Sequence, residues 1–174
     1  NAMDESRDAY TATVPVNDYD GTAIDITLKR PFAKLRVVTT DIKDMFNVLP
    51  EEVTVEYTSS FYTKFNAFTS QVVSDSQAYA LKTKTIKISE NKYTNEWNDE
   101  GKVKENLTLF ADYYFAANEQ EPISFTLDVK DNKEMAIPQV VFNTPIPIQR
   151  NYLTTVMGPV LTDANSITVV VNDA

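Results

Sequence analysis

Apolar and polar residues alternate in short segments along most of this chain. The clearest cases are residues 107–116 and 123–129, where apolar side chains occupy every second position. A period of two is typical of half-buried strands, because successive side chains point to opposite faces of a sheet. With the weaker segments included, the pattern predicts about nine strands, at residues 10–16, 24–40, 53–57, 65–73, 80–89, 107–116, 123–129, 149–158 and 167–171.

The first of these segments is predicted to be a half-buried edge strand. Its apolar face carries Tyr10, Ala12, Val14 and Val16. Pro15 has no amide hydrogen for a central ladder, which favours the edge of a sheet. A second proline, Pro31, predicts a bend within residues 24–40. The one helical candidate is a short turn capped by Thr40 or Asp41 and ending at Phe46.

The last third of the chain, residues 140–171, is the richest in β-forming residues. Pro145 and Pro147 hold its first part extended, and Gly158, followed by another proline, ends the strand at 149–158. The chain closes with a β-branched run whose inner face is predicted to be Ile167, Val169 and Val171. In residues 107–116 the predicted inner face is Leu107, Leu109, Ala111 and Tyr113.

Many short strands with turns between them predict an all-β fold, a transthyretin-like or Greek-key sandwich of about seven to nine strands with at most one short helix. The 174 residues are enough for one domain, which we place at 8–174. Residues 1–7 are expected to be a tag remnant and disordered lead-in, and residues 8–28 an appended or exchangeable edge segment.

Composition excludes several kinds of chemistry. The chain has no cysteine and no histidine, so disulfides, thiolate metal sites and serine–histidine catalysis are ruled out. Zinc sites also depend on these residues, so we predict no metal, no cofactor and no enzymatic activity. The net charge of −9 repels phosphates, which argues against nucleic acid and anionic membrane surfaces as partners.

Four groups of polar or aromatic residues are candidate sites. Neighbouring acidic residues, at 51–52, 99–100, and 119 with 121, have the residue type of a glycosidase pair, but nothing sets their separation. Asp18 and Asp20 lack the remaining ligands of a calcium loop. Lys29, Arg30, Lys34 and Arg36 form a basic cluster that could bind an acidic glycan or an acidic neighbouring subunit, although alternation also explains it as a strand's outer face. Tyr93 and Trp97, with Tyr113 and Tyr114, are candidates for stacking against a sugar.

Four segments together resemble the fimbrillin-like proteins of Bacteroidales, a type V pilin-like family. They are KRPFAKL at 29–35, FNAFT at 65–69, IPIQRNYLTTVMGPVLT at 146–162, and the closing strand at 167–171. The resemblance implies transthyretin-like sandwich domains that are exported as surface lipoproteins. Some members polymerise by inserting a strand of one subunit into the next, and others are anchors, tips or adhesins. Fimbrillins commonly have two such domains, so this chain is expected to be the C-terminal one.

Two functional hypotheses follow. The first is a non-enzymatic fimbrial or adhesion protein of the cell surface or outer membrane, whose native signal or lipid anchor was lost with the original N-terminus. It would dock to other subunits, or to a surface or host glycan or protein, through the edges at Tyr10–Val16 and Ile167–Val171. The alternative is a glycan-binding module of a polysaccharide-uptake system, with Tyr93 and Trp97 as contacts.

Overall fold

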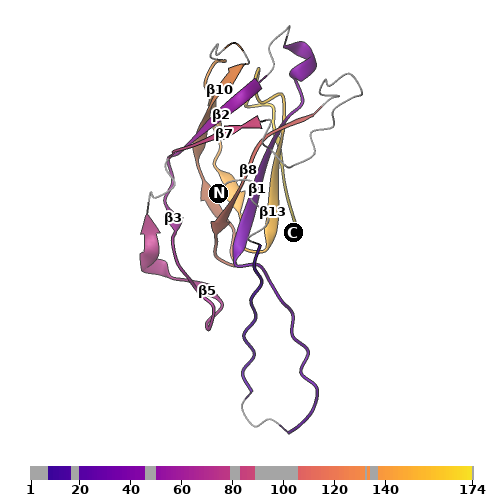
Figure 1. Ribbon diagram of the computed structural model, residues 1–174, viewed down its shortest axis with the longest axis vertical. Coiled ribbons are helices and arrows are strands. Elements are labelled where there is room, and N and C mark those ends of the chain that lie inside the picture. Colours follow the sequence, from indigo (N-terminus) through magenta and orange to yellow (C-terminus); the bar gives the residue numbers. More distant parts are fainter. Residues whose placement is uncertain are drawn as a thin grey trace.

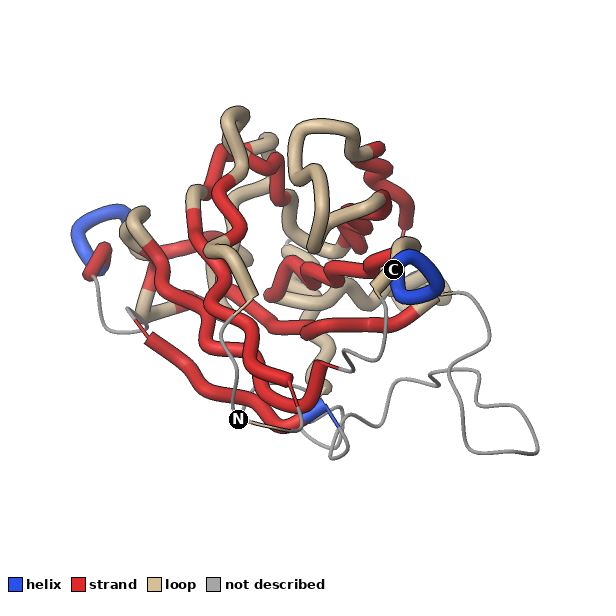
Figure 2. Tube along the Cα trace, turned by 90° about the horizontal axis from the view of Figure 1, so that it is seen from above, coloured by secondary structure: helices blue, strands red, loops and turns tan. Residues whose placement is uncertain are grey.

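The fold is an all-β sandwich, as the alternation predicts. The computed structural model describes residues 8–16, 20–45, 50–78, 83–88, 106–131, 133 and 137–173. Within these ranges the helical elements are two 3₁₀ turns, Ile42–Asp44 and Ser74–Ser76, and no helix has the length and apolar character needed to cross a membrane. Strands make up the body and the helical turns lie at its margins (Figure 2).

The strands differ widely in length. Their bounds are β1 Phe32–Thr39, β2 Pro50–Tyr57, β3 Phe61–Tyr62, β4 Phe65–Asn66, β5 Gln71–Val72, β6 Gln77–Ala78, β7 Thr83–Lys87, β8 Leu107–Phe115, β9 Glu121–Ile123, β10 Phe125–Asp131, β11 Val140–Val141, β12 Ile146–Ile148, β13 Tyr152–Gly158 and β14 Thr168–Asp173.

The larger sheet has six strands in the order β14-β13-β1-β8-β3-β6. β1 lies at its centre, parallel to β13, with Leu35 opposite Thr154, and antiparallel to β8, with Leu35 opposite Asp112. β13 and β14 form an antiparallel pair in which Tyr152 lies opposite Asp173. The first, middle and last parts of the chain therefore meet in one sheet (Figure 1).

The second layer is an antiparallel sheet in the order β11-β10-β2-β7, and two small pairs, β12-β9 and β4-β5, complete the described strands. The inner faces of both layers are apolar and buried, with Leu35 and Val37 from β1 packed in one core with Val53, Val55 and Leu127 from the second sheet. This core follows directly from the period of two in each strand.

One extra residue in β8 changes which tyrosine enters the core. Val37 pairs with Phe110 but Val38 pairs with Thr108, so Leu109 has no counterpart on β1. Such a bulge shifts the alternation by one position. Tyr114 is consequently buried while Tyr113 is half-exposed, so the prediction that Tyr113 lies on the inner face is wrong.

Of the two strands predicted at the start of the chain, the first is wrong and the second is correct only from Phe32 onward. Residues 10–16 contain one isolated bridge and no strand, and residues 20–29 are exposed and unpaired except at Lys29. The strand predicted from Ile24 begins only at Phe32, after the buried Pro31, where the chain enters the sheet. Alternation was correct about amphipathic character here but not about burial.

Three later segments differ in detail from the structure that the sequence predicts. Residues 65–73 form a tight hairpin, β4–β5, because Ser70 turns the chain with a left-handed φ of 53°. Residues 123–129 alternate as predicted, but Ser124 separates β9, which pairs with β12, from β10, which pairs with β2. Asp41 precedes the 3₁₀ turn without capping it through its side chain.

Three polar groups are linked inside the core. The hydroxyl of Tyr57 donates to Oδ2 of Asp112 at 2.9 Å and lies 2.6 Å from the hydroxyl of Tyr114. All three residues are at least 98% buried. The rings of Tyr57 and Tyr114 meet edge to face, and Phe61 stacks on Tyr114 with ring centres 4.7 Å apart. The network joins β2 to β8, one strand from each layer.

We expect Tyr57→Phe to destabilise the fold by roughly 1–3 kcal/mol, because the buried Asp112 and Tyr114 each lose a hydrogen-bond partner. Urea unfolding measures this loss. The matched control is Tyr152→Phe at a half-buried position, for which the change should stay within about 0.5 kcal/mol. An equal effect of both substitutions would contradict a stabilising role for the buried network.

Alkaline pH should unfold the protein through the same tyrosines. Burial raises the pKa of Tyr57 and of Tyr114 well above the ordinary value, so both stay neutral in the fold. In the unfolded chain they ionise near pH 10. Their contribution to the free energy of unfolding is therefore present in full below about pH 10 and decreases above it. The wild type should lose stability with rising pH more steeply than Tyr57→Phe, by up to about 1.4 kcal/mol per pH unit, in urea titrations across this range.

Candidate functional site

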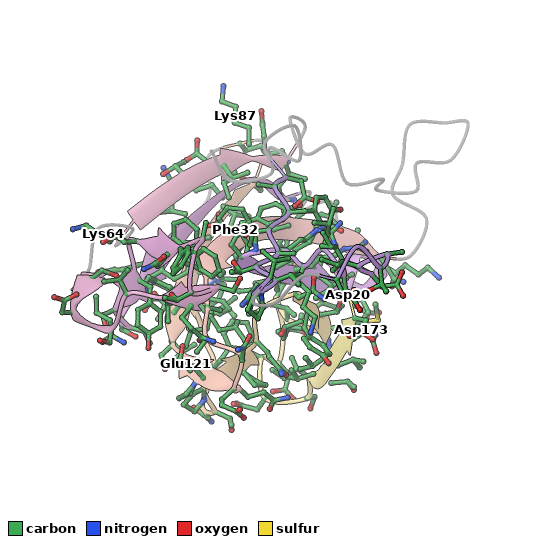
Figure 3. The ribbon with its side chains drawn as sticks, turned by 90° about the horizontal axis from the view of Figure 1, so that it is seen from below. Asp20, Phe32, Lys64, Lys87, Glu121 and Asp173 are labelled. Atoms are coloured by element: carbon green, nitrogen blue, oxygen red, sulfur yellow. The ribbon has the colours of Figure 1, made fainter. Side chains whose placement is uncertain are left out.

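An arm formed by residues 8–16 and 20–30 stands apart from the sandwich. Its limbs extend away from the sheets and meet at the base, where Thr11 and Lys29 exchange backbone hydrogen bonds of 2.9 and 3.1 Å (Figure 1). Seen from below, the arm with Asp20 projects toward the viewer (Figure 3). Of the nine large apolar side chains exposed among the described residues, five lie on the arm: Tyr10, Val16, Ile24, Ile26 and Leu28.

The base of the arm is fixed by Arg30. Its Nε donates to Oδ2 of Asp8 at 2.7 Å, and its guanidinium lies 4.7 Å from the centre of the Tyr10 ring. Its backbone amide donates to Oδ1 of Asn151 at 2.9 Å. The second limb is therefore anchored at the residue before Pro31, while residues 20–29 remain in solvent.

Arg150 joins this base to the β4–β5 hairpin. Its Nε donates to the carbonyl of Arg30 at 3.1 Å, Nη1 donates to the carbonyl of Ser70, and the guanidinium lies 5.0 Å from the centre of the Phe65 ring. These partners are neutral and Arg150 is 7% exposed, so burial lowers its pKa. The first limb is held to the same hairpin, because the Thr13 hydroxyl donates to the carbonyl of Ala67 at 2.7 Å.

β14 is an edge strand of the larger sheet. It pairs with β13 on one side, and no other described strand pairs with its outer side. Val169 and Val171 on its inner face are only half-buried, because the sheet ends there, and Val170 on its outer face is 42% exposed. Among the described strands β14 is therefore the last of its sheet, the kind of position at which a further strand can add.

The turn between β13 and β14 is fixed tightly, which sets the position of this edge. The buried carboxylate of Asp41 accepts hydrogen bonds from the amides of Leu161 and Thr162 at 3.0 and 2.8 Å. At Gly158, a Cβ atom would lie 2.6 Å from the carbonyl oxygen of Ser166, so only glycine fits there.

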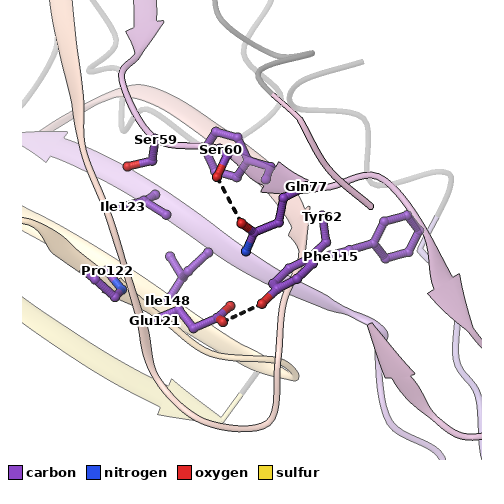
Figure 4. A pocket seen from close by; sticks show the side chains of 10 residues that line it. Ser59, Ser60, Tyr62, Gln77, Phe115, Glu121, Pro122, Ile123 and Ile148 are labelled. Atoms are coloured by element: carbon purple, nitrogen blue, oxygen red, sulfur yellow. Dashed lines mark hydrogen bonds between the residues drawn. The ribbon is translucent and has the colours of Figure 1, made fainter. Parts of the chain in front are cut away.

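A cavity of about 380 Å³ opens at the flank of the sandwich, away from β14 in the order of strands. It lies between β3 and β6 on one side and β9 and β12 on the other. The Tyr62 hydroxyl donates to Oε1 of Glu121 at 2.7 Å, and the Ser60 hydroxyl donates to Oε1 of Gln77 at 3.3 Å (Figure 4). The remaining lining residues are Ser59, Phe61, Phe115, Pro122, Ile123 and Ile148.

Most of the other candidate site residues contact side chains or backbone groups of the same chain. In the basic cluster, Arg30 pairs with Asp8, Lys34 lies 5.5 Å from the centre of the Tyr113 ring, and Arg36 donates to the Thr108 hydroxyl at 2.9–3.1 Å. Glu52 faces Lys130 at 3.7 Å. Asp20 accepts from the Thr22 amide at 2.9 Å, as a polar turn residue does.

Some predicted positions lie outside the described residues, namely Asp18, Tyr93, Trp97, Asp99 and Glu100. Within the ranges that the structure describes, no group of three or more acidic side chains is arranged to hold a metal ion. The strand-exchange candidates are described, and the structure separates them: Tyr10, Ala12, Val14 and Val16 lie on the arm, whereas Ile167, Val169 and Val171 lie at the sheet edge.

Comparison with known families gives a match over residues 1–174 to DUF6562, a family of unknown function. The chain belongs to the DUF6562 family. Neither curated proteins nor solved structures give a significant match to it.

In this DUF6562 protein, sequence reasoning missed the cavity and the structural role of Arg150. The cavity is assembled from five separate segments, and no local pattern connects them. Arg150 and Asn151 belong to the segment 146–162, which the sequence links to function only through the fimbrillin resemblance. The sequence does carry a signal at Asn151, because an asparagine inside a β-rich stretch is a frequent site of left-handed backbone.

Asn151 offers a test of this junction. Its φ is 66°, its amide donates to the carbonyl of Phe32 at 2.8 Å, and its side chain binds the Arg30 amide. We expect Asn151→Gly to cost roughly 0.5–1.5 kcal/mol through the lost side-chain bond. Asn151→Ala should cost about 1 kcal/mol more, because alanine resists a left-handed φ. Denaturant unfolding measures both, and equal losses would contradict the backbone argument.

Proposed function

We propose that this DUF6562 protein is a non-enzymatic fimbrial or adhesive protein of the cell surface that docks to partner subunits by strand addition. The arm of one copy adds to the outer edge of β14 on the next copy. The observation that carries the proposal is the arm itself, an extended segment with alternating apolar side chains exposed to solvent. The fimbrillin resemblance supports the location at the cell surface.

The second limb, residues 20–30, is the better donor. Its backbone between residues 20 and 28 has no partner in the strands described, and it contains no proline before Pro31. The first limb is tied down through Thr13 and interrupted by Pro15, which cannot donate to a ladder. Strand addition would supply main-chain hydrogen bonds for affinity and side-chain alternation for register.

The direction of the arm favours a second copy over the chain's own edge. The arm leaves the sheet at the start of β1, and this is the end at which β14 finishes, because β1 is parallel to β13 and Tyr152 pairs with Asp173. To reach its own β14, the limb would have to reverse over the anchored Arg30. Extended beyond the sheet, it is instead available to another molecule.

One antiparallel register pairs all three apolar side chains of the limb with those of the closing strand, and we propose that register. Ile26 would lie opposite Val169, with Ile24 opposite Val171 and Leu28 opposite Ile167. The half-buried valines of β14 would then be covered by the exposed apolar side chains of the limb. In the same register Asp25 lies opposite Val170 on the outer face, with Cβ atoms about 5 Å apart.

We expect two single-cysteine variants, Asp25→Cys and Val170→Cys, to form a crosslinked dimer when mixed and treated with a short bismaleimide. The chain has no cysteine of its own, so each product reports one pair of positions. The dimer is measured by denaturing gel electrophoresis and mass spectrometry of the full chain.

The matched control is Val141→Cys, an exposed position on the edge strand of the other sheet. Asp25→Cys should give no dimer with it above the background level. A second control, Val171→Lys, places a charge on the inner face of β14 and should suppress the specific crosslink. If Asp25→Cys crosslinks equally to both edges, or to neither, strand addition at β14 is wrong.

A further inference from the structure

The cavity at the flank of the sandwich combines donors and acceptors of hydrogen bonds. Tyr62 donates its hydroxyl hydrogen to Glu121, which raises the pKa of Tyr62 and keeps the phenol protonated. Glu121 retains a second carboxylate oxygen as an acceptor. The carbonyl of Gln77 accepts from Ser60, so its amide nitrogen is the group that interacts with the Tyr62 hydroxyl, and its second N–H is left as a donor. One wall therefore offers a carboxylate and an amide side by side (Figure 4).

The rest of the lining is apolar and held in place by the core. Phe115 stacks between Phe32 and Phe65, with ring centres 4.8 and 5.9 Å away. Phe61 is packed against Tyr57 and Tyr114. These contacts fix the aromatic rings before any ligand arrives, so little side-chain entropy would be lost on binding.

We infer that this cavity is a binding site for a single neutral sugar residue. Sugar hydroxyls both donate and accept, which matches the pair of Gln77 and Glu121, and the C–H face of a sugar ring packs on aromatic and aliphatic side chains. A volume of about 380 Å³ is at the small end of ligand cavities, which fits one ring better than a long oligomer.

Other ligand classes fit less well. A phosphate or other anion would meet Glu121, and none of the described residues that line the cavity is a lysine or arginine. A metal ion would find one carboxylate, whereas oxygen-coordinated metals need several ligands. A primary amine would be attracted by Glu121 but would face the donor nitrogen of Gln77. The site is built from strands other than β14 and the arm, so it is independent of strand addition.

The test is a titration of the ¹⁵N-labelled full chain with methyl glycosides of glucose, galactose, mannose and N-acetylglucosamine, followed by two-dimensional NMR. At least one glycoside should shift the amide signals of Tyr62, Gln77 and Glu121, with a dissociation constant near about 1 mM, as expected for a ligand of this size. Glu121→Gln keeps the shape of the side chain and should weaken binding about tenfold, through loss of a charged hydrogen-bond acceptor.

Gln77→Ala is the second variant and should also weaken binding, while Glu51→Gln, an exposed change on β2 outside the cavity, should leave it unchanged. Unfolding curves for each variant establish that the fold is intact. The inference is overturned if no glycoside shifts these signals, or if both cavity variants bind as the wild type does. It is also overturned if Nα-acetyl-lysine amide occupies the site more tightly than every glycoside.

Discussion

The structure depends on the pairing of β1 with two strands at once. β1 is parallel to β13 and antiparallel to β8, and Leu35 and Val37 on its inner face are fully buried. Parallel neighbours cannot be joined by a tight turn. Here β1 ends at Thr39 and β13 begins at Tyr152, so most of the sandwich lies between the two strands in the chain. This pairing places the point at which the arm joins β1 and the last residues of β14 at the same end of one sheet.

The most specific residues of the fimbrillin resemblance have structural explanations. Arg150 and Asn151 clamp the entry to β1, Gly158 permits close approach of Ser166, and Thr162 is bound by the buried Asp41. None of these residues belongs to the cavity or to the arm. The motif therefore specifies how β13 is held between β1 and β14. In this chain these residues therefore act on the framework of the sandwich and not on a ligand.

The sequence predicted those parts of the fold in which alternation and burial agree. Residues 53–57 and 107–116 were placed correctly because their apolar faces meet a partner in the same chain. The bulge at Leu109 has no signal in the local pattern, so Tyr113 was assigned to the wrong face. The cavity could not be predicted, because Ser60, Gln77 and Glu121 become neighbours only through the pairing of distant strands.

The prediction that the arm residues form half-buried strands is wrong for a different reason. A period of two predicts that a segment is amphipathic. It does not predict that the same chain covers the apolar face of that segment. An exposed alternating segment beside an open edge strand carries a risk of uncontrolled aggregation. Asp20 and Asp25 on the limb, together with a net charge of −9, oppose indiscriminate association between copies. Alternation retained despite this risk is explained most simply if the limb has a defined partner strand. Asp25 does not obstruct that pairing, because it lies on the face opposite to Ile24, Ile26 and Leu28.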